Sequence, residues 1–163
     1  MFSHGRLRIS VVIALVWIVL VFAGIDRWTS SSHHATLAAL PGITAPEVTA
    51  CAAAGLQYPY ELLHAVHQRG QERVATKLRL PSERVQELVD ASHLSEFRGI
   101  GLRTLPLLHA AGITRIEELA DQESAAFTAR LQHLSEASGV PPPYERQVRG
   151  WIDAAQRWTA RHR

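Results

Sequence analysis

The chain of 163 residues has a single cysteine, Cys51, and this scarcity excludes several classes of protein. One cysteine cannot form an intramolecular disulfide, and it leaves no CxxC pair and no multi-cysteine zinc site. Cys51 lies in "TACAAAGL" without the basic neighbour that activates a thiol, so we expect a small buried packing residue. P-loop, dinucleotide-binding and G-x-S-x-G signatures are also missing. The sequence therefore predicts a protein that is not an enzyme and holds no cofactor or metal.

Aromatic residues and net charge are also scarce. Aromatics make up 7% of the chain, whereas hydrophobic residues reach 47% and are mostly Ala and Leu, which favours closely packed helices over a sheet. The formal charge is +2, but Arg6 and Arg8 precede the rest of the charged groups, and the other 15 basic residues balance the 15 acidic ones. We expect an all-α protein whose globular part has no overall cationic field.

An apolar segment without charge, "ISVVIALVWIVLVFAGI", covers residues 9–25. At about 1.5 Å per residue, a helix of this length reaches roughly 25 Å, the lower end of what crosses a bilayer. We expect residues 1–28 to anchor the chain in membrane lipid as a single transmembrane helix, with Trp28 at the interface. A cleaved signal peptide is the alternative, because "VFA" before Gly24 offers small residues at a cleavage site.

The charges that flank this segment predict its orientation. Arg6 and Arg8 precede it, whereas Asp26 and Arg27 cancel each other just after it. Because positive charge is retained on the cytoplasmic side, we expect the short N-terminus in the cytoplasm. The domain then lies on the periplasmic side of a bacterial inner membrane.

Two histidine pairs are candidate metal ligands. His33 and His34 lie in "TSSSHHAT", residues 29–36, a polar linker between anchor and domain. His64 and His67 are spaced to share one helix face. Neither pair has a carboxylate or cysteine at zinc-site spacing, so we expect no metal at either.

The rest of the chain contains an internal repeat. "LAALPGITAPEVTACAAAGLQYPYELL", residues 37–63, aligns without gaps with residues 94–120 at an offset of 57. Eight pairs are identical: Leu37/Leu94, Gly42/Gly99, Ile43/Ile100, Ala53/Ala110, Ala54/Ala111, Gly55/Gly112, Glu61/Glu118 and Leu62/Leu119. A weaker match continues after a six-residue insertion, with Val85/Val148, Val89/Ile152 and Asp90/Asp153 corresponding. The sequence predicts a domain over residues 37–158, with repeats at 37–93 and 94–158 and a basic tail at 159–163.

Local signals within the repeats predict helices. Thr44 with Glu47 and Thr114 with Glu117 each have the spacing of a capping box. Ser82 after Pro81 predicts the cap of another helix. The inward face of that helix is predicted by apolar spacing and consists of Val85, Leu88, Val89 and Ser92.

The repeats resemble the helix-hairpin-helix motif, in which Gly-apolar-Gly precedes a helix that ends in a small-small-Gly-apolar step. The matching residues of the second repeat are Phe97, Gly99, Ile100, Gly101, Leu105, Leu108, Ala111, Gly112 and Ile113. Residues 37–158 also resemble a bacterial domain-of-unknown-function family of two such units, through "LRLPSERVQELVDASHLSEFRGIG" and "RGWIDAAQRW". The resemblance implies two tandem helix-hairpin-helix-like units without an established activity.

Phosphate binding is the activity that such hairpins predict, because glycines let the backbone approach a phosphate and helix N–H groups donate to it. The candidate phosphate-binding residues of the second repeat are Arg98, Gly99, Gly101, Arg103 and Thr104. In the first repeat Thr44 replaces the second glycine and Glu47 adds negative charge. The glycines predicted to form turns are Gly42, Gly55, Gly99, Gly101 and Gly112.

These observations favour a membrane-anchored, non-enzymatic interaction or scaffold module. An accessory subunit of a larger membrane complex, for example a respiratory or photosynthetic one, fits a single anchor that carries a compact domain. Its partners are then membrane lipid and other protein subunits. The alternative is a membrane-tethered protein that binds the DNA backbone, without sequence preference, through the second hairpin.

Overall fold

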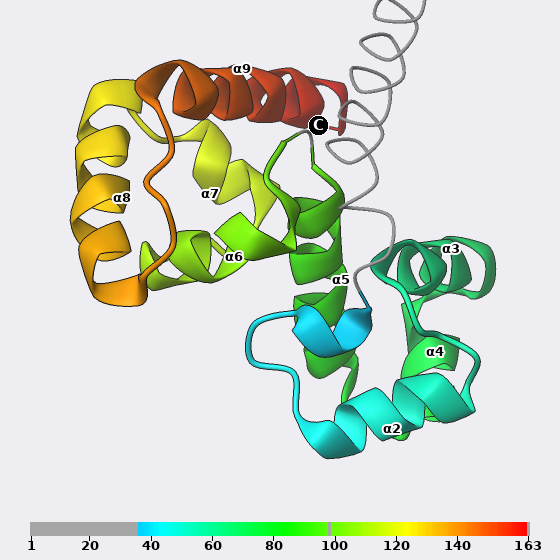
Figure 1. Ribbon diagram of the computed structural model, residues 1–163. Helices are drawn as coiled ribbons and strands as arrows, with labels where there is room; N and C mark the ends of the chain where they lie inside the picture. Colours follow the sequence, from blue (N-terminus) through cyan, green and yellow to red (C-terminus); the bar gives the residue numbers. More distant parts are fainter. Residues whose placement is uncertain (1–35, 98, 163) are drawn as a thin grey trace, which may run out of the picture. The chain divides into compact units, whose positions relative to one another are not determined.

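The computed structural model describes residues 36–97 and 99–162, and these residues are all α. A short 3₁₀ helix, η1 (Leu37–Ala39), precedes eight α-helices (Figure 1). The helices are α2 (Ala45–Ala53), α3 (Pro59–Arg69), α4 (Gln71–Leu78), α5 (Ser82–Glu96), α6 (Gly101–Ala110), α7 (Ile116–Ala120), α8 (Ser124–Ser138) and α9 (Glu145–His162). The predicted anchor at residues 9–25 lies outside the described residues, and none of the described helices is long and apolar enough to cross a membrane.

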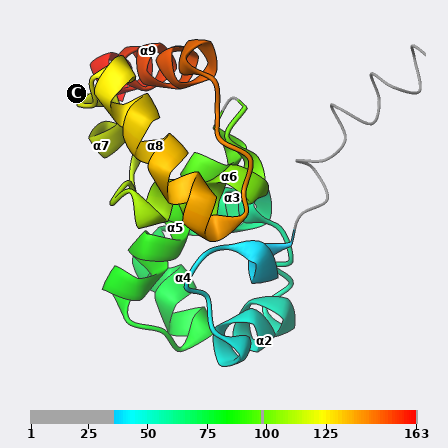
Figure 2. The ribbon, with the colours of Figure 1, turned by 60° about the vertical axis from the view of Figure 1, so that its left-hand side comes forward.

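The helices form two groups with similar internal contacts, although α3 also packs against α4 and the corresponding pair, α7 and α8, does not pack to that extent. In the first group α5 packs against α3 and α4, and α2 contacts α4. In the second group α9 packs against α7 and α8, and α6 contacts α8. The long helix α5 also contacts α6 and α7, so it joins the groups, and Figures 1 and 2 show α2 and α9 at opposite ends of the domain.

The backbone hydrogen bonds recur at the offset of 57 residues. Both α2 and α6 end in a Schellman motif, in which a glycine with φ near +78° follows the last turn. In the first repeat the N–H of Leu56 donates to the carbonyl of Cys51 (2.8 Å), and in the second the N–H of Ile113 donates to that of Leu108 (2.9 Å). The two helices therefore end in the same geometry, because a residue without a Cβ penalty occupies the left-handed position.

Equivalent positions also supply the core. Leu62 and Leu119 are fully buried at the offset of 57, and Val85 and Val148 are fully buried at the offset of 63 that relates α5 to α9. The predicted inward face of α5 is confirmed, since its four residues are at most 6% exposed. Cys51 is buried as well, at 1% exposure.

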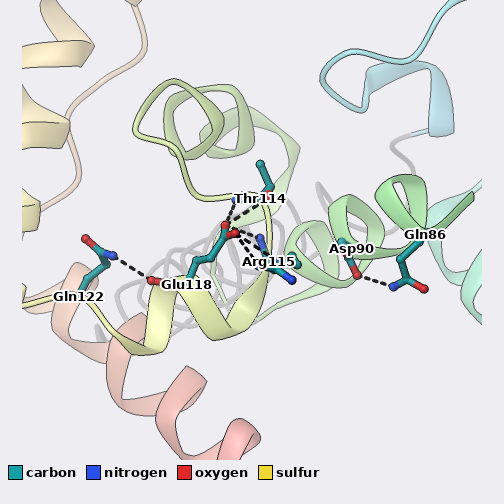
Figure 3. Close-up of polar contacts among 6 residues, drawn as sticks. All are labelled: Gln86, Asp90, Thr114, Arg115, Glu118 and Gln122. Carbon is teal, nitrogen blue, oxygen red and sulfur yellow. Dashed lines mark hydrogen bonds and ion pairs between the residues drawn. The ribbon is translucent and has the colours of Figure 1, made fainter. Parts of the chain in front are cut away.

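Two of the predicted helix caps are wrong. The helix α7 begins at Ile116, one residue later than the Thr114–Glu117 pair requires, and Glu118 accepts the N–H groups of Thr114 (2.7 Å) and Arg115 (3.2 Å) (Figure 3). Ser82 is the first helical residue of α5 rather than its cap. The capping box of Thr44 and Glu47 is confirmed.

Candidate functional site

The first hairpin, residues 40–56, is held closed by an ion pair. Glu47 lies in the first turn of α2 and accepts the N–H of Thr44 at 2.7 Å. From α5, Arg84 donates its Nε to Glu47 Oε1 at 2.6 Å and its Nη2 to Glu47 Oε2 at 3.0 Å. The same Nη2 donates to the carbonyl of Gly42 at 2.6 Å. The turn and the start of α2 are therefore attached to α5 through one guanidinium.

The electrostatics of this ion pair keep both partners charged. The hydrogen bonds from Arg84 hold the pKa of Glu47 at about 2, below its ordinary value of 4.5. The same bonds raise the pKa of Arg84. A carboxylate is also favourable at the positive end of a helix. Glu47 thus occupies the place at the start of α2 where a phosphate group would have to bind.

The second hairpin, residues 97–113, shares the left-handed glycine of the first, but its helix begins at Gly101, the counterpart of Thr44, one residue earlier than α2 begins in the first. Gly99 and Gly101 have φ of +78° and +62°, and α6 has no acidic residue in its first turn. Arg103 is exposed and Thr104 is half-buried, whereas Arg98 lies outside the described residues. The structure therefore brings Gly99, Gly101, Arg103 and Thr104 to one helix start.

The repeat correspondence shows why the described residues of this hairpin form no ion pair equivalent to that of Glu47 and Arg84. At the offset of 57, Thr104 takes the place of Glu47. At the offset of 63 between α5 and α9, Gln147 takes the place of Arg84. Both charges have been replaced by neutral groups, so the start of α6 has neither the carboxylate nor the guanidinium of its counterpart.

Two further basic side chains, one in each repeat, donate a hydrogen bond to a backbone carbonyl at the end of a helix. Lys77 of α4 donates its Nζ to the carbonyl of Ala54 at 2.9 Å. Arg130 of α8 donates its Nη2 to the carbonyl of Ala111, the equivalent residue. A cation is favourable at the carbonyl end of a helix. These two charges therefore cap the ends of α2 and α6.

The largest difference between the repeats lies behind the hairpins. On α9, Trp151 is 3% exposed, and its Nε1 lies 3.4 Å from where a Cβ on Gly99 would be. The equivalent residue on α5 is the smaller Leu88, and no atom among the described residues lies within 4 Å of a Cβ built on Gly42. A cavity of about 320 Å³ lies beside Gly42 and Leu88.

Three segments line this cavity: the first hairpin, α5, and the α6–α7 region. The lining residues are Pro41, Gly42, Arg84, Glu87, Leu88, Asp90, Ala91, His109 and Thr114. Thr114 is positioned by the turn that Glu118 fixes, and Gln86 donates to Asp90 at 2.7 Å (Figure 3). The volume is at the lower end of the range for small-ligand sites. This cavity is the strongest candidate site in the described part of the chain, and sequence analysis did not predict it.

Burial alters the titration of two groups that line the cavity. It raises the pKa of the Asp90 carboxyl and lowers the pKa of the His109 imidazole. The Nε2 atom of His109 is buried, and within the described ranges it has no hydrogen-bond partner. In those ranges no three His, Cys, Asp or Glu side chains are grouped to hold a metal ion. Burial also raises the pKa of Cys51, so its thiol is not an activated nucleophile.

The fold and the site define a class: an all-α domain of two groups of helices joined by α5, with a cavity lined by the first hairpin, α5 and the α6–α7 region. The chain belongs to the family described as Domain of unknown function (DUF4332), whose model matches residues 41–158. No curated protein and no solved structure matches the chain.

Proposed function

We propose that the chain is a membrane-anchored, non-enzymatic interaction module of two tandem helix-hairpin-helix-like units. It acts as an accessory subunit of a larger membrane complex, for example a respiratory or photosynthetic one. Residues 9–25 anchor it in the bacterial inner membrane, with its N-terminus in the cytoplasm and its domain on the periplasmic side. Its partners are membrane lipid and other subunits of that complex.

The observation that carries this proposal is the closed first hairpin. Glu47 occupies the helix start, and Arg84 is bound to Glu47 and to the carbonyl of Gly42. Lys77 and Arg130 also bind the backbone of the domain itself. Side chains that would attract phosphate thus stabilise the fold, which favours protein partners for the domain. The uncharged run at residues 9–25 supports a membrane location.

The test is to isolate the full-length chain from its native membranes in a mild detergent. We expect it to elute together with other subunits in constant proportion, at a mass well above that of a detergent-bound monomer. A chain recovered only as a monomer, at every detergent concentration that keeps known complexes intact, would contradict the proposal.

A second candidate function is binding of the DNA backbone through the second hairpin. Two observations favour it: α6 has no acidic residue in its first turn, and Arg103 is exposed beside Gly99 and Gly101. Backbone N–H groups at such a helix start donate to phosphate, and a nearby Arg supplies much of the affinity.

The second candidate is tested with duplex DNA and the full-length chain at about 0.15 M salt. The interaction module predicts no binding above that of a charge-neutral control protein. DNA binding that is lost in Arg103→Glu, but retained when the equally exposed Arg146 is replaced in Arg146→Glu, would favour the second candidate instead.

A further inference from the structure

The cavity is lined by Gly42 and Leu88, whose counterparts in the second repeat are Gly99 and Trp151. Trp151 and Leu88 occupy equivalent positions on α9 and α5, and Gly99 and Gly42 occupy equivalent positions in the two turns. In the second repeat the indole Nε1 lies 3.4 Å from where a Cβ on Gly99 would be. In the first repeat Leu88 is shorter than tryptophan, and the space beside Gly42 is part of the cavity of about 320 Å³.

The shape of this cavity follows from the repeat. A flat ring that enters between the Gly42 turn and Leu88 meets a glycine and small apolar groups, as Trp151 does at Gly99. Pro41 and Ala91 are the small apolar residues of this lining, which the side chains of Arg84, Glu87, Asp90, His109 and Thr114 complete. A planar aromatic side chain is therefore the group whose shape the domain already accommodates at the corresponding place.

The charges around the cavity are predominantly negative. Its lining holds one cation, Arg84, which is bound to Glu47 at 2.6 Å and to Glu87 at 2.5 Å. Asp90 also lines the cavity. Its carboxylate accepts a hydrogen bond from the amide of Gln86 and forms no ion pair with any of the described residues. Burial raises its pKa, so a cation placed beside it would stabilise the charged carboxylate. The cavity thus favours an aromatic group with positive charge next to it.

We propose that this cavity is the docking site for an aromatic side chain of a partner protein, followed in the partner's sequence by a lysine or arginine that binds beside Asp90. The partner's ring takes the place that Trp151 has in the second repeat. The inference rests on the proposed interaction function and names the chemistry of the partner that the module binds. Aromatic residues packed into a glycine-lined cavity are typical anchors of protein interfaces.

The binding test uses the full-length chain in phospholipid nanodiscs and two short peptides that contain 5-fluorotryptophan, followed by ¹⁹F NMR. In one peptide the fluorotryptophan precedes lysine, and in the other it precedes alanine. We expect saturable binding of both, with the lysine peptide bound about fivefold more tightly, as a partly buried charge pair allows. If neither peptide showed saturable binding, the proposal would be overturned.

Two variants fill the cavity. Leu88→Trp recreates the residue of the second repeat, and Thr114→Trp adds a ring at an exposed position of the lining, where folding does not depend on a core position. Each is expected to weaken binding at least tenfold. The matched control is Leu134→Trp, on α8 and outside the cavity lining, which is expected to leave binding unchanged. Peptide binding unchanged in a folded Thr114→Trp chain would contradict the site.

The charge of the site is tested by a pair of equivalent residues. Asp90→Asn is expected to remove the fivefold preference for the lysine peptide, whereas Asp153→Asn, the exposed counterpart on α9, is expected to preserve it. A preference that survives in Asp90→Asn would contradict the assigned partner chemistry.

Extraction of the variants from native membranes distinguishes failure of this site from failure of the function. A wild-type chain recovered as a monomer contradicts the interaction module itself. If the wild-type chain is recovered in a complex, and the Leu88→Trp and Thr114→Trp chains are recovered in the same complex, only the docking site is contradicted.

Discussion

The two hairpins share the φ angles of their glycine turns and helix ends but differ where their helices begin, since Thr44 has φ of −95° and its counterpart Gly101 has φ of +62°. The turns at Gly42 and Gly99 and the helix ends at Gly55 and Gly112 have nearly the same φ angles. In the first hairpin an ion pair from α5 closes the turn and a cavity lies beside it, whereas the described residues of the second hairpin form no equivalent ion pair and the indole of Trp151 lies beside its turn. Side chains of different size and charge thus support the turns at Gly42 and Gly99, and the turn at Gly42 lines a cavity.

The largest expected effect breaks the packing of the second hairpin. Trp151→Leu copies the residue of the first repeat, and we expect the free energy of unfolding to fall by about 3 kcal/mol, because a fully buried indole is lost and a cavity forms beside Gly99. Urea denaturation followed by circular dichroism measures it. The control is Trp158→Leu, since Trp158 is only half-buried and should cost about 1 kcal/mol. Equal losses in the two variants would contradict the role given to Trp151.

The next effect breaks the ion pair of the first hairpin. Arg84→Met leaves Glu47 as a nearly buried carboxylate without its cation, and we expect a loss of about 2 kcal/mol in the free energy of unfolding. The control is Gln147→Met, which places a methionine at the equivalent position of α9. It should change the free energy of unfolding by less than about 0.5 kcal/mol. If the two substitutions had the same effect, the difference between the hairpins would not lie in this ion pair.

The third effect is the pH dependence that Glu47 of the first hairpin contributes to stability. The pKa of Glu47 is about 2 in the folded chain and 4.5 ordinarily, so the unfolded state binds a proton more readily. The stabilisation is therefore complete above about pH 5 and is lost as the pH falls from about 4.5 towards 2, by up to about 2 kcal/mol after solvent screening.

The measurement is the difference in unfolding free energy between wild type and Glu47→Gln, from urea titrations between pH 2.5 and 7. Other carboxylates with lowered pKa values, such as Glu118 and Glu123, cancel in this difference. A difference that stays constant over the whole range would show that Glu47 is not held by Arg84.

Sequence patterns predicted the glycine helix ends and the buried face of α5, because glycine turns and apolar spacing act locally. The left-handed positions at Gly55 and Gly112 and the inward face of α5 follow from residues close together in the chain. The cap of α7 was predicted one residue too early, since Glu117 and Glu118 are adjacent and either satisfies the pattern. The repeat held the signal that decides between them, because Glu61 caps α3 at the position equivalent to Glu118.

The parts that were missed depend on contacts distant in sequence. The helix α8 was not predicted, because its Ala, Ser and Thr residues give little apolar contrast between faces. The ion pair joins residues 47 and 84, and local spacing does not relate them. The cavity is lined by Leu88, which stands where the other repeat has Trp151, and that correspondence becomes visible only when α5 is aligned with α9 at the offset of 63.

The central claim is that the domain binds protein through its first repeat. It is tested most directly by extracting wild-type and Leu88→Trp chains from native membranes in mild detergent and comparing their masses. The account predicts that the wild-type chain elutes in a complex with other subunits and that the folded Leu88→Trp chain elutes alone. A wild-type chain that elutes alone, or a folded variant that stays in the complex, would contradict it.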